Sequence, residues 1–149
     1  MSEGRIVLVD DEEMVTQNLE MLLSMETGYE SVSFNRPAAA LEYLKKNKAD
    51  VVLSDFIMPG MNGLDLLAQV KEVQPTCSRL LLTGYADKES AVRAINEVGL
   101  FQYLEKPWDN DFVMMTLRND VERSRLLNQL QDKTQSLDTF REEVWKMLI

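Results

Sequence analysis

The 149-residue sequence contains no histidine and a single cysteine, Cys77. Without histidine, the Ser-His-Asp and Cys-His nucleophile systems are excluded, and one cysteine can form neither an intrachain disulfide nor a multi-cysteine zinc site. No apolar run approaches the roughly 18 residues that a membrane span requires. Any chemistry of this chain must therefore come from carboxylates, lysines and hydroxyl groups.

Basic residues are also scarce, because 16 Lys and Arg stand against 25 Asp and Glu, giving a formal net charge of −9. Nucleic-acid phosphates have to be neutralised by Lys or Arg, so we expect no direct nucleic-acid binding by this segment. The N-terminal stretch MSEGRIVLVDDEE lacks the basic region, apolar core and cleavage site of a secretory signal. We therefore expect a soluble, cytoplasmic protein that does not contact a membrane.

Five short apolar runs alternate with amphipathic helical patterns along the chain. Runs such as IVLV, VVLS and LLLT are almost continuously apolar, which is typical of parallel strands covered on both faces. The order predicts an α/β fold with a doubly wound five-stranded parallel sheet. The expected strands are Arg5 to Val9, Glu30 to Phe34, Val51 to Ser54, Arg79 to Thr83 and Phe101 to Lys106. The expected intervening helices are Met14 to Met25, Pro37 to Lys46, Leu64 to Val73 and Asp87 to Val98.

A fifth helical pattern starts after Asp109 and contains no glycine or proline before Ile149. Its length of roughly 40 residues exceeds the usual range of about 8 to 20 for globular helices. The first turns can pack on the sheet, and a heptad repeat follows them, which predicts a coiled-coil stalk and a homodimer. The two heptad positions hold Leu130, Leu137 and Val144, and Leu126, Lys133, Phe140 and Met147.

Polar residues follow the predicted strands at the edge where ligands bind in open parallel sheets. In chain order they are Asp10 and Asp11, Asp55, Thr83, and Lys106. Clustered carboxylates repel one another unless a cation or a proton is bound, and an all-oxygen site with few protein ligands suits Mg²⁺. An ammonium and a hydroxyl opposite the metal can hold the oxygens of a transferring phosphoryl group. We then expect one carboxylate to act as a nucleophile that forms an acyl phosphate.

Four motifs at these strand ends make the chain resemble the receiver domain of two-component response regulators. They are Val9-Asp10-Asp11, the stretch from Asp55 to Gly63 that matches D-x-x-M-P-x-M-x-G, Leu82-Thr83-Gly84, and Tyr103-Leu104-Glu105-Lys106-Pro107. Each motif is weak alone, but four in order at the ends of the first, third, fourth and fifth strands are specific. The resemblance covers residues 4 to about 122 and implies the flavodoxin-like receiver fold.

The resemblance implies a phosphoacceptor and a metal site. Asp55 would accept a phosphoryl group from a phosphohistidine of a sensor histidine kinase or a phosphotransfer protein. Asp10 and Asp11 would hold Mg²⁺ together with Asp55 and the main-chain carbonyl oxygen of Ile57. The chain would then be a signalling phosphoacceptor in a phosphorelay, catalysing only its own phosphorylation and dephosphorylation.

The resemblance also implies a switch and a domain plan. Thr83 and Lys106 would bind the phosphoryl oxygens, and Tyr103 would be an aromatic switch that turns inward as Thr83 moves towards the phosphate. We expect residues 1–122 to form the receiver and residues 123–149 to form a helical linker. That linker would lead to an output domain that the sequence does not contain.

Other interpretations use the same residues. Individually, the Asp10-Asp11 pair can cap a helix, and Tyr103 can be a packing aromatic. A haloacid-dehalogenase-type phosphatase needs Asp-x-Asp after the first strand, where this chain has Asp10-Asp11-Glu12. A flavodoxin-like flavin carrier needs a hydroxyl- and glycine-rich phosphate loop there, and the acidic residues would repel its phosphate. A phosphate-independent interaction module is disfavoured because every residue of the site is present.

Overall fold

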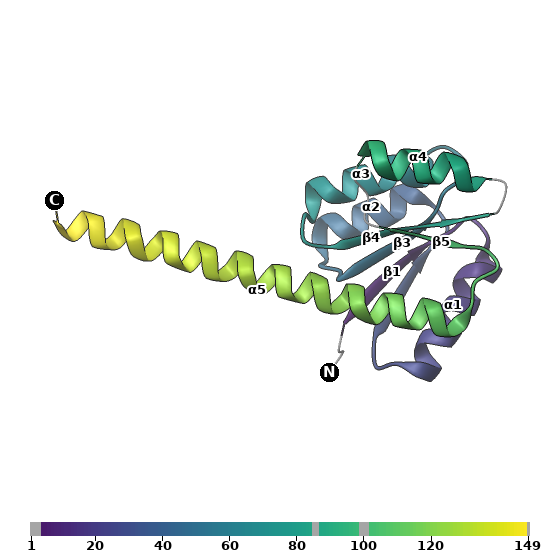
Figure 1. The fold of residues 1–149 in the computed structure, drawn as a ribbon, viewed down its shortest axis with the longest axis horizontal. Helices are drawn as coiled ribbons and strands as arrows, with labels where there is room; N and C mark the ends of the chain where they lie inside the picture. Colours follow the sequence, from purple (N-terminus) through teal and green to yellow (C-terminus); the bar gives the residue numbers. More distant parts are fainter. Residues whose placement is uncertain (1–3, 85–86, 99–101, 149) are drawn as a thin grey trace.

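Strands and helices alternate along the chain in the computed structural model, which describes residues 4–84, 87–98 and 102–148 (Figure 1). The strands are β1 (Arg5–Val9), β2 (Glu30–Phe34), β3 (Val51–Asp55), β4 (Ser78–Thr83) and β5 (Gln102–Glu105). The helices are α1 (Glu13–Glu26), α2 (Pro37–Lys46), α3 (Gly63–Val73), α4 (Lys88–Val98) and α5 (Asn110–Leu148). Every predicted element is present within a few residues of its predicted bounds, although Phe101 lies outside the described residues.

The five strands form one parallel sheet in the order β2-β1-β3-β4-β5. Helices α1 and α5 cover one face, and α2, α3 and α4 cover the other (Figure 1). This arrangement confirms the predicted doubly wound sheet. The strand order reverses between β1 and β3, so the carboxyl ends of these two strands form the crevice in which such folds bind ligands.

Alternate residues of each strand enter two separate cores. In β1, Ile6 and Leu8 pack with residues of α1 and α5, including Leu19 and Leu117. Val7 and Val9 face the other way and pack with residues of α2 and α3. Because both faces of the central strands are covered, no polar alternation is needed, and the sequence of these strands is continuously apolar.

Helix α5 is 39 residues long and leaves the body formed by the sheet and the other helices as one continuous rod (Figure 1). Its first turns are buried against the sheet through Val113, Leu117 and Val121. Beyond them the helix is mostly exposed, including the heptad residues Leu126, Leu130, Leu137, Phe140 and Met147. Across the part of the chain that the structure describes, no helix is both long and apolar enough to cross a membrane.

Polar contacts hold α5 to the lower edge of the sheet, at the amino ends of the strands. The Ser78 hydroxyl donates to the main-chain oxygen of Asp120 at 2.9 Å, and Arg125 Nε lies 4.0 Å from Asp50 Oδ1. The side chains of Thr76 and Asn128 also form a hydrogen bond. Contacts between the body and α5 therefore extend to residue 128.

Candidate functional site

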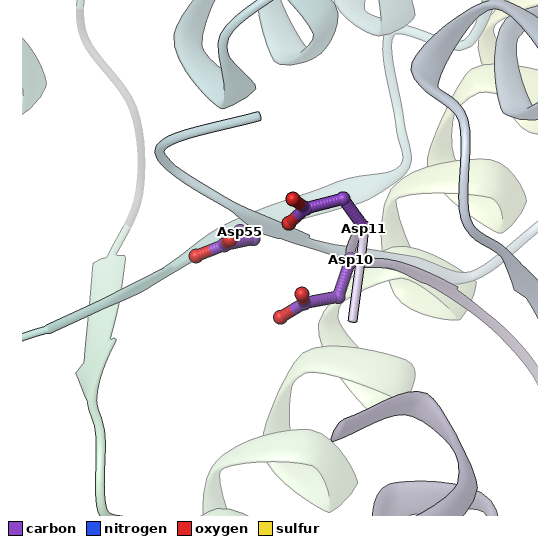
Figure 2. Close-up of side chains that lie close together, drawn as sticks. All are labelled: Asp10, Asp11 and Asp55. Carbon is purple, nitrogen blue, oxygen red and sulfur yellow. The ribbon is translucent and has the colours of Figure 1, made fainter. Parts of the chain in front are cut away.

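Three carboxylates meet at the carboxyl edge of the sheet. Asp10 follows β1 directly, Asp11 is the next residue, and Asp55 ends β3. Each offers an oxygen atom, and these atoms lie within 4.8 Å of one another. Asp10 and Asp55 are buried, whereas Asp11 is exposed. Figure 2 shows the Asp10 and Asp11 side chains projecting towards the side on which Asp55 lies.

Lys106 links two of these carboxylates. Its ammonium nitrogen lies 3.0 Å from Asp10 Oδ2 and 3.2 Å from Asp55 Oδ1. The residue directly follows β5, and its main-chain N–H donates to the Thr83 carbonyl oxygen at 2.8 Å, which extends the pairing of β4 with β5. The Lys106-Pro107 peptide bond is cis. The fifth strand thus delivers the ammonium to the carboxylates that β1 and β3 present.

Thr83 ends β4, the strand next to that of Asp55. The register pairs Asp55 with Leu82, so Thr83 is one residue beyond the partner of Asp55 on the same side of the molecule. The Thr83 side chain is buried, and its hydroxyl donates to the Gly84 carbonyl oxygen at 3.2 Å. A buried hydroxyl therefore lies at the same sheet edge as the carboxylates.

The two remaining predicted site residues are Tyr103 and Ile57. Tyr103 pairs with Leu81 in the sheet and is a partly buried residue that packs on the core shared by α2, α3 and α4. Ile57 lies two residues beyond Asp55, in the loop that leads to α3, and its side chain is 58% exposed. The sequence motifs therefore converge on one edge of the fold.

Residues 6–118 match the family described as the response regulator receiver domain. The chain is 35% identical over 124 residues to the hydrogenase transcriptional regulatory protein HoxA of Cupriavidus necator. It is 39% identical over 111 residues to the DNA-binding transcriptional regulator NtrC of Escherichia coli K12. These alignments cover 83% and 74% of this chain but only 25% and 23% of the relatives. The chain therefore spans about a quarter of the length of the curated relatives it matches.

A solved structure agrees with this match. The signal receiver domain of an HD domain-containing protein from Pseudomonas fluorescens Pf-5 is similar with a TM-score of 0.79 and 33% identity, covering 87% of this chain and 94% of that one. The chain belongs to the response regulator receiver family. It is a two-component phosphoacceptor domain with an acidic pocket of Asp10, Asp11 and Asp55, and its family implies a histidine kinase partner.

The electrostatics of the receiver pocket leave its carboxylates short of positive charge. Burial, reinforced by the charge of Asp10, raises the pKa of Asp55 to about 6. Burial also raises the pKa of Asp10, against the opposing effects of the Glu12 N–H and Lys106. Although burial opposes it, the hydrogen bond and charge of Asp10 raise the pKa of Lys106. Lys106 pairs with two of the three carboxylates, those of Asp10 and Asp55, and a second cation would relieve the remaining repulsion.

The donor set of the pocket fits Mg²⁺. Three carboxylates offer oxygen atoms within 4.8 Å of one another, and one of the three side chains is open to solvent. Mg²⁺ prefers oxygen ligands, binds few protein groups and retains several waters. An acidic cluster of this kind is typical of the metal site of receivers. Asp10, Asp11 and Asp55 are the side chains that could hold the ion.

The sequence motifs did not assign a role to two polar residues, Asn62 and Asn35. Asn62 accepts a hydrogen bond from the Asp65 N–H at 2.9 Å and so caps α3. Asn before a helical pattern is a known capping signal, so this role was available in the sequence. Asn35 donates from its side chain to the Asp10 main-chain oxygen. No spacing rule predicts that contact, because it joins a side chain to a carbonyl group 25 residues away.

Proposed function

We propose that Asp55 is the phosphoacceptor and that it receives its phosphoryl group from a phosphohistidine of a sensor histidine kinase or a phosphotransfer protein. The observation that carries this proposal is the position of its carboxylate. Asp55 lies where the strand order reverses, close to Asp10 and Asp11, and Lys106 Nζ is 3.2 Å from Oδ1. A nucleophile, a metal site and a cationic partner for phosphoryl oxygens thus occupy one crevice.

The contacts of Asp55 distinguish its two oxygen atoms. Oδ1 accepts a hydrogen bond from the Phe56 N–H at 3.0 Å and lies beside Lys106. Oδ2 is the atom left for attack on phosphorus. A bond forms between Oδ2 and phosphorus, the phosphorus–nitrogen bond of the donor breaks, and the imidazole leaves with the electron pair. The product is an acyl phosphate on Asp55, and hydrolysis of that bond returns the carboxylate. We propose no action on any other substrate.

The other side chains of the crevice assist this transfer. Asp10, Asp11 and Asp55, with the main-chain carbonyl oxygen of Ile57, would hold Mg²⁺. The ion supplies neutralising charge to the phosphoryl oxygens when bound. Lys106 contributes a second positive charge, which is free to turn from the carboxylates to the phosphoryl group.

A conformational switch follows from the position of Thr83 on β4. Its hydroxyl bonds to the neighbouring Gly84 carbonyl oxygen, a contact that a phosphoryl oxygen on Asp55 can replace. Tyr103 would then turn inward on β5. Replacing Thr83 with alanine should therefore allow phosphorylation but abolish most of the structural response to beryllofluoride, a phosphate mimic. A wild-type pattern of amide chemical-shift changes in that variant would contradict the switch.

Helix α5 is proposed to carry this response to an output domain. Residues 1–122 would form the receiver, and residues 123–149 a linker whose exposed heptad residues pair two chains in a parallel coiled coil. The exposure of Leu130, Leu137 and Phe140 supports pairing, because each would bury apolar surface in a dimer. The greater length of HoxA and NtrC supports a connection to an output domain.

Phosphorylation by acetyl phosphate tests the proposal directly. Incubation with Mg²⁺ should add one acid-stable, base-labile phosphoryl group by intact mass, and chelation of the metal should prevent it. Asp55→Asn should remove the modification. Asp65→Asn is the matched control, because it makes the same change at an exposed position ten residues away. Undiminished labelling of Asp55→Asn would overturn the assignment.

A further inference from the structure

Asn35 connects the loop after β2 to the backbone that carries the acidic pair. Its Nδ2 atom donates to the main-chain oxygen of Asp10 at 2.8 Å. The same atom lies 3.4 Å from the hydroxyl oxygen of Thr16, a buried residue in the first turns of α1. One side-chain amide therefore spans the segment between the end of β1 and the start of α1.

The contact with Asp10 continues the sheet ladder beyond its last backbone pair. Strands β1 and β2 are paired up to Val9 and Phe34. The Asp10 N–H then donates to the Phe34 carbonyl oxygen at 3.1 Å, and the Asp10 carbonyl oxygen accepts from the Asn35 side chain. Both peptide groups that flank the Asp10 Cα are consequently fixed to two successive residues of the neighbouring chain segment.

This fixed peptide controls where two carboxylates point. The Asp10 carbonyl belongs to the Asp10-Asp11 peptide unit, so a rotation of that unit would move the Asp11 Cα and its exposed side chain. Asp10 itself uses Oδ1 to accept the Glu12 N–H at 2.9 Å, which places its carboxylate relative to the same turn. Within residues 4–84, 87–98 and 102–148, the Asn35 contact is the hydrogen bond that reaches this peptide from outside the turn, so the orientation of the pair depends on it.

The turn formed by Asp10, Asp11 and Glu12 gains from a hydrogen bond that comes from outside it. The carboxylates of Asp10 and Asp11 lie close to that of Asp55, so they repel one another before a cation binds. Glu12 is the N-cap of α1, and in the described structure its side chain makes no capping hydrogen bond. The amide of Asn35 is uncharged and donates two hydrogens, so it can hold the turn without adding to the repulsion.

We propose that Asn35 is a positioning residue that orients the Asp10-Asp11 peptide and thereby sets the Mg²⁺ affinity of the pocket. The inference rests on the proposed metal site. Partners that orient metal ligands commonly change metal affinity by 10- to 100-fold when they are removed. Asn35 touches neither the phosphoryl group nor the metal in this scheme, and it acts only through the backbone of the ligands.

Calorimetric titration of the full chain with Mg²⁺ tests this role. Asn35→Ala should weaken Mg²⁺ binding about tenfold or more. Asn47→Ala is the matched control, because Asn47 also donates from Nδ2 to a main-chain oxygen, that of Tyr43 at 3.0 Å, at the end of α2. The control should bind Mg²⁺ within about twofold of the unmodified chain. Thermal unfolding shows whether each variant is folded during the titration.

The outcomes separate this inference from the proposed function. If the unmodified chain binds no Mg²⁺, both the metal site and the role of Asn35 are wrong. If the unmodified chain binds Mg²⁺ and folded Asn35→Ala binds it equally well, only the role of Asn35 is overturned. Should Asn35→Ala not fold, Asn35→Ser decides, because its shorter side chain keeps a polar group at the turn but does not reach the Asp10 oxygen. Unweakened binding in that variant would overturn the inference as well.

Discussion

Gly63 at the start of α3 lies against the main-chain oxygen of Asp55. A Cβ atom built on Gly63 would lie 2.1 Å from that oxygen and 2.9 Å from Leu81 Cδ1. The Gly63 N–H also donates to the Phe56 carbonyl oxygen at 2.7 Å. Helix α3 can approach the end of β3 this closely because residue 63 has no side chain.

Gly63→Ala should therefore destabilise the fold by about 2 to 3 kcal/mol, because the added methyl group meets backbone that cannot move aside. Urea unfolding of the two proteins would measure the difference. Gly84→Ala is the control, since the nearest atom to its added Cβ is Asp87 Oδ2 at 3.9 Å. Equal stability of Gly63→Ala and the unmodified chain would contradict the steric argument.

Lys106→Met should lower the free energy of unfolding by roughly 2 to 3 kcal/mol at neutral pH in the presence of a chelator. The substitution leaves the buried carboxylates of Asp10 and Asp55 without their cationic partner. Mg²⁺ should recover part of the loss, because a bound cation replaces the missing charge.

Lys45→Met provides the comparison for Lys106. Lys45 pairs with Glu42 at the same 3.2 Å that separates Lys106 from Asp55, but both partners are exposed. Exposed pairs contribute little, so the unfolding midpoint of Lys45→Met should barely change and should respond to Mg²⁺ as the unmodified chain does. A Lys106→Met variant as stable as Lys45→Met would show that the pocket tolerates its unpaired carboxylates.

Asp120 should make stability fall as pH rises from about 4 to about 6. Burial raises the pKa of this carboxyl group to about 6, and its Oδ2 has no hydrogen-bond partner among the described residues. Arg123 is the charged group that opposes the shift. Because the folded state holds the proton more tightly than the unfolded state, the folded state loses relative stability as the pH passes through this range.

Asp120→Asn should make that slope shallower, leaving the part that Asp55 contributes through its own raised pKa. It should stabilise the chain by roughly 1 to 3 kcal/mol at pH 8, with little difference near pH 3.5. Denaturant unfolding at several pH values would measure it. Asp132→Asn, at an exposed position on the same helix, is the matched control because it removes a carboxylate in the same way. A loss of stability in Asp120→Asn at pH 8 would mean that the ionised carboxylate has a favourable partner.

The C-terminal part of α5, which carries the heptad residues from Leu126 to Met147, should determine the oligomeric state. Each apolar heptad side chain contributes roughly 1.5 to 3 kcal/mol of binding free energy when it is fully buried. The sum is ample to pair two chains after the association cost, although Lys133 weakens the contact between the two helices. Sedimentation should give a dimer for the full chain and a monomer for a version ending at Gln129, which keeps the contact of Asn128 with Thr76. Two monomers at micromolar concentration would contradict the coiled coil.

A point substitution gives the same test without truncation. Leu137→Glu places a charge at a heptad position and should dissociate the dimer. Gln135→Glu makes the same charge change on the opposite, exposed side of the helix and should not. Equal behaviour of the two variants would mean that Leu137 does not lie in an interface.

The sequence predicted the fold because its signals are local and repeated. Continuously apolar runs identified β1, β3 and β4, and their lengths agree with the structure to within one residue. Asp55 was expected just after its strand, yet it pairs with Leu82 as the last residue of β3. Strand ends are less predictable than strand centres, because backbone pairing with a neighbour decides them.

Long-range polar contacts escaped prediction for a different reason. The sequence motifs include neither Asn35 nor Asp120. The first reaches Asp10, and the second is buried against β4, where Ser78 binds its main-chain oxygen. Such roles depend on which segments meet in space, and neither periodicity nor spacing along one segment carries that information.

The continuity of α5 makes it a lever. About 20 residues separate Asn128, where the contacts of α5 with the body end, from Leu148, and at 1.5 Å per residue they span roughly 30 Å. A tilt of about 5° in the part of α5 that rests on β3 and β4 would displace the far end by about 2.6 Å. A small change in the angle of α5 on the sheet would thus become a displacement of a few ångströms at the far end of the helix.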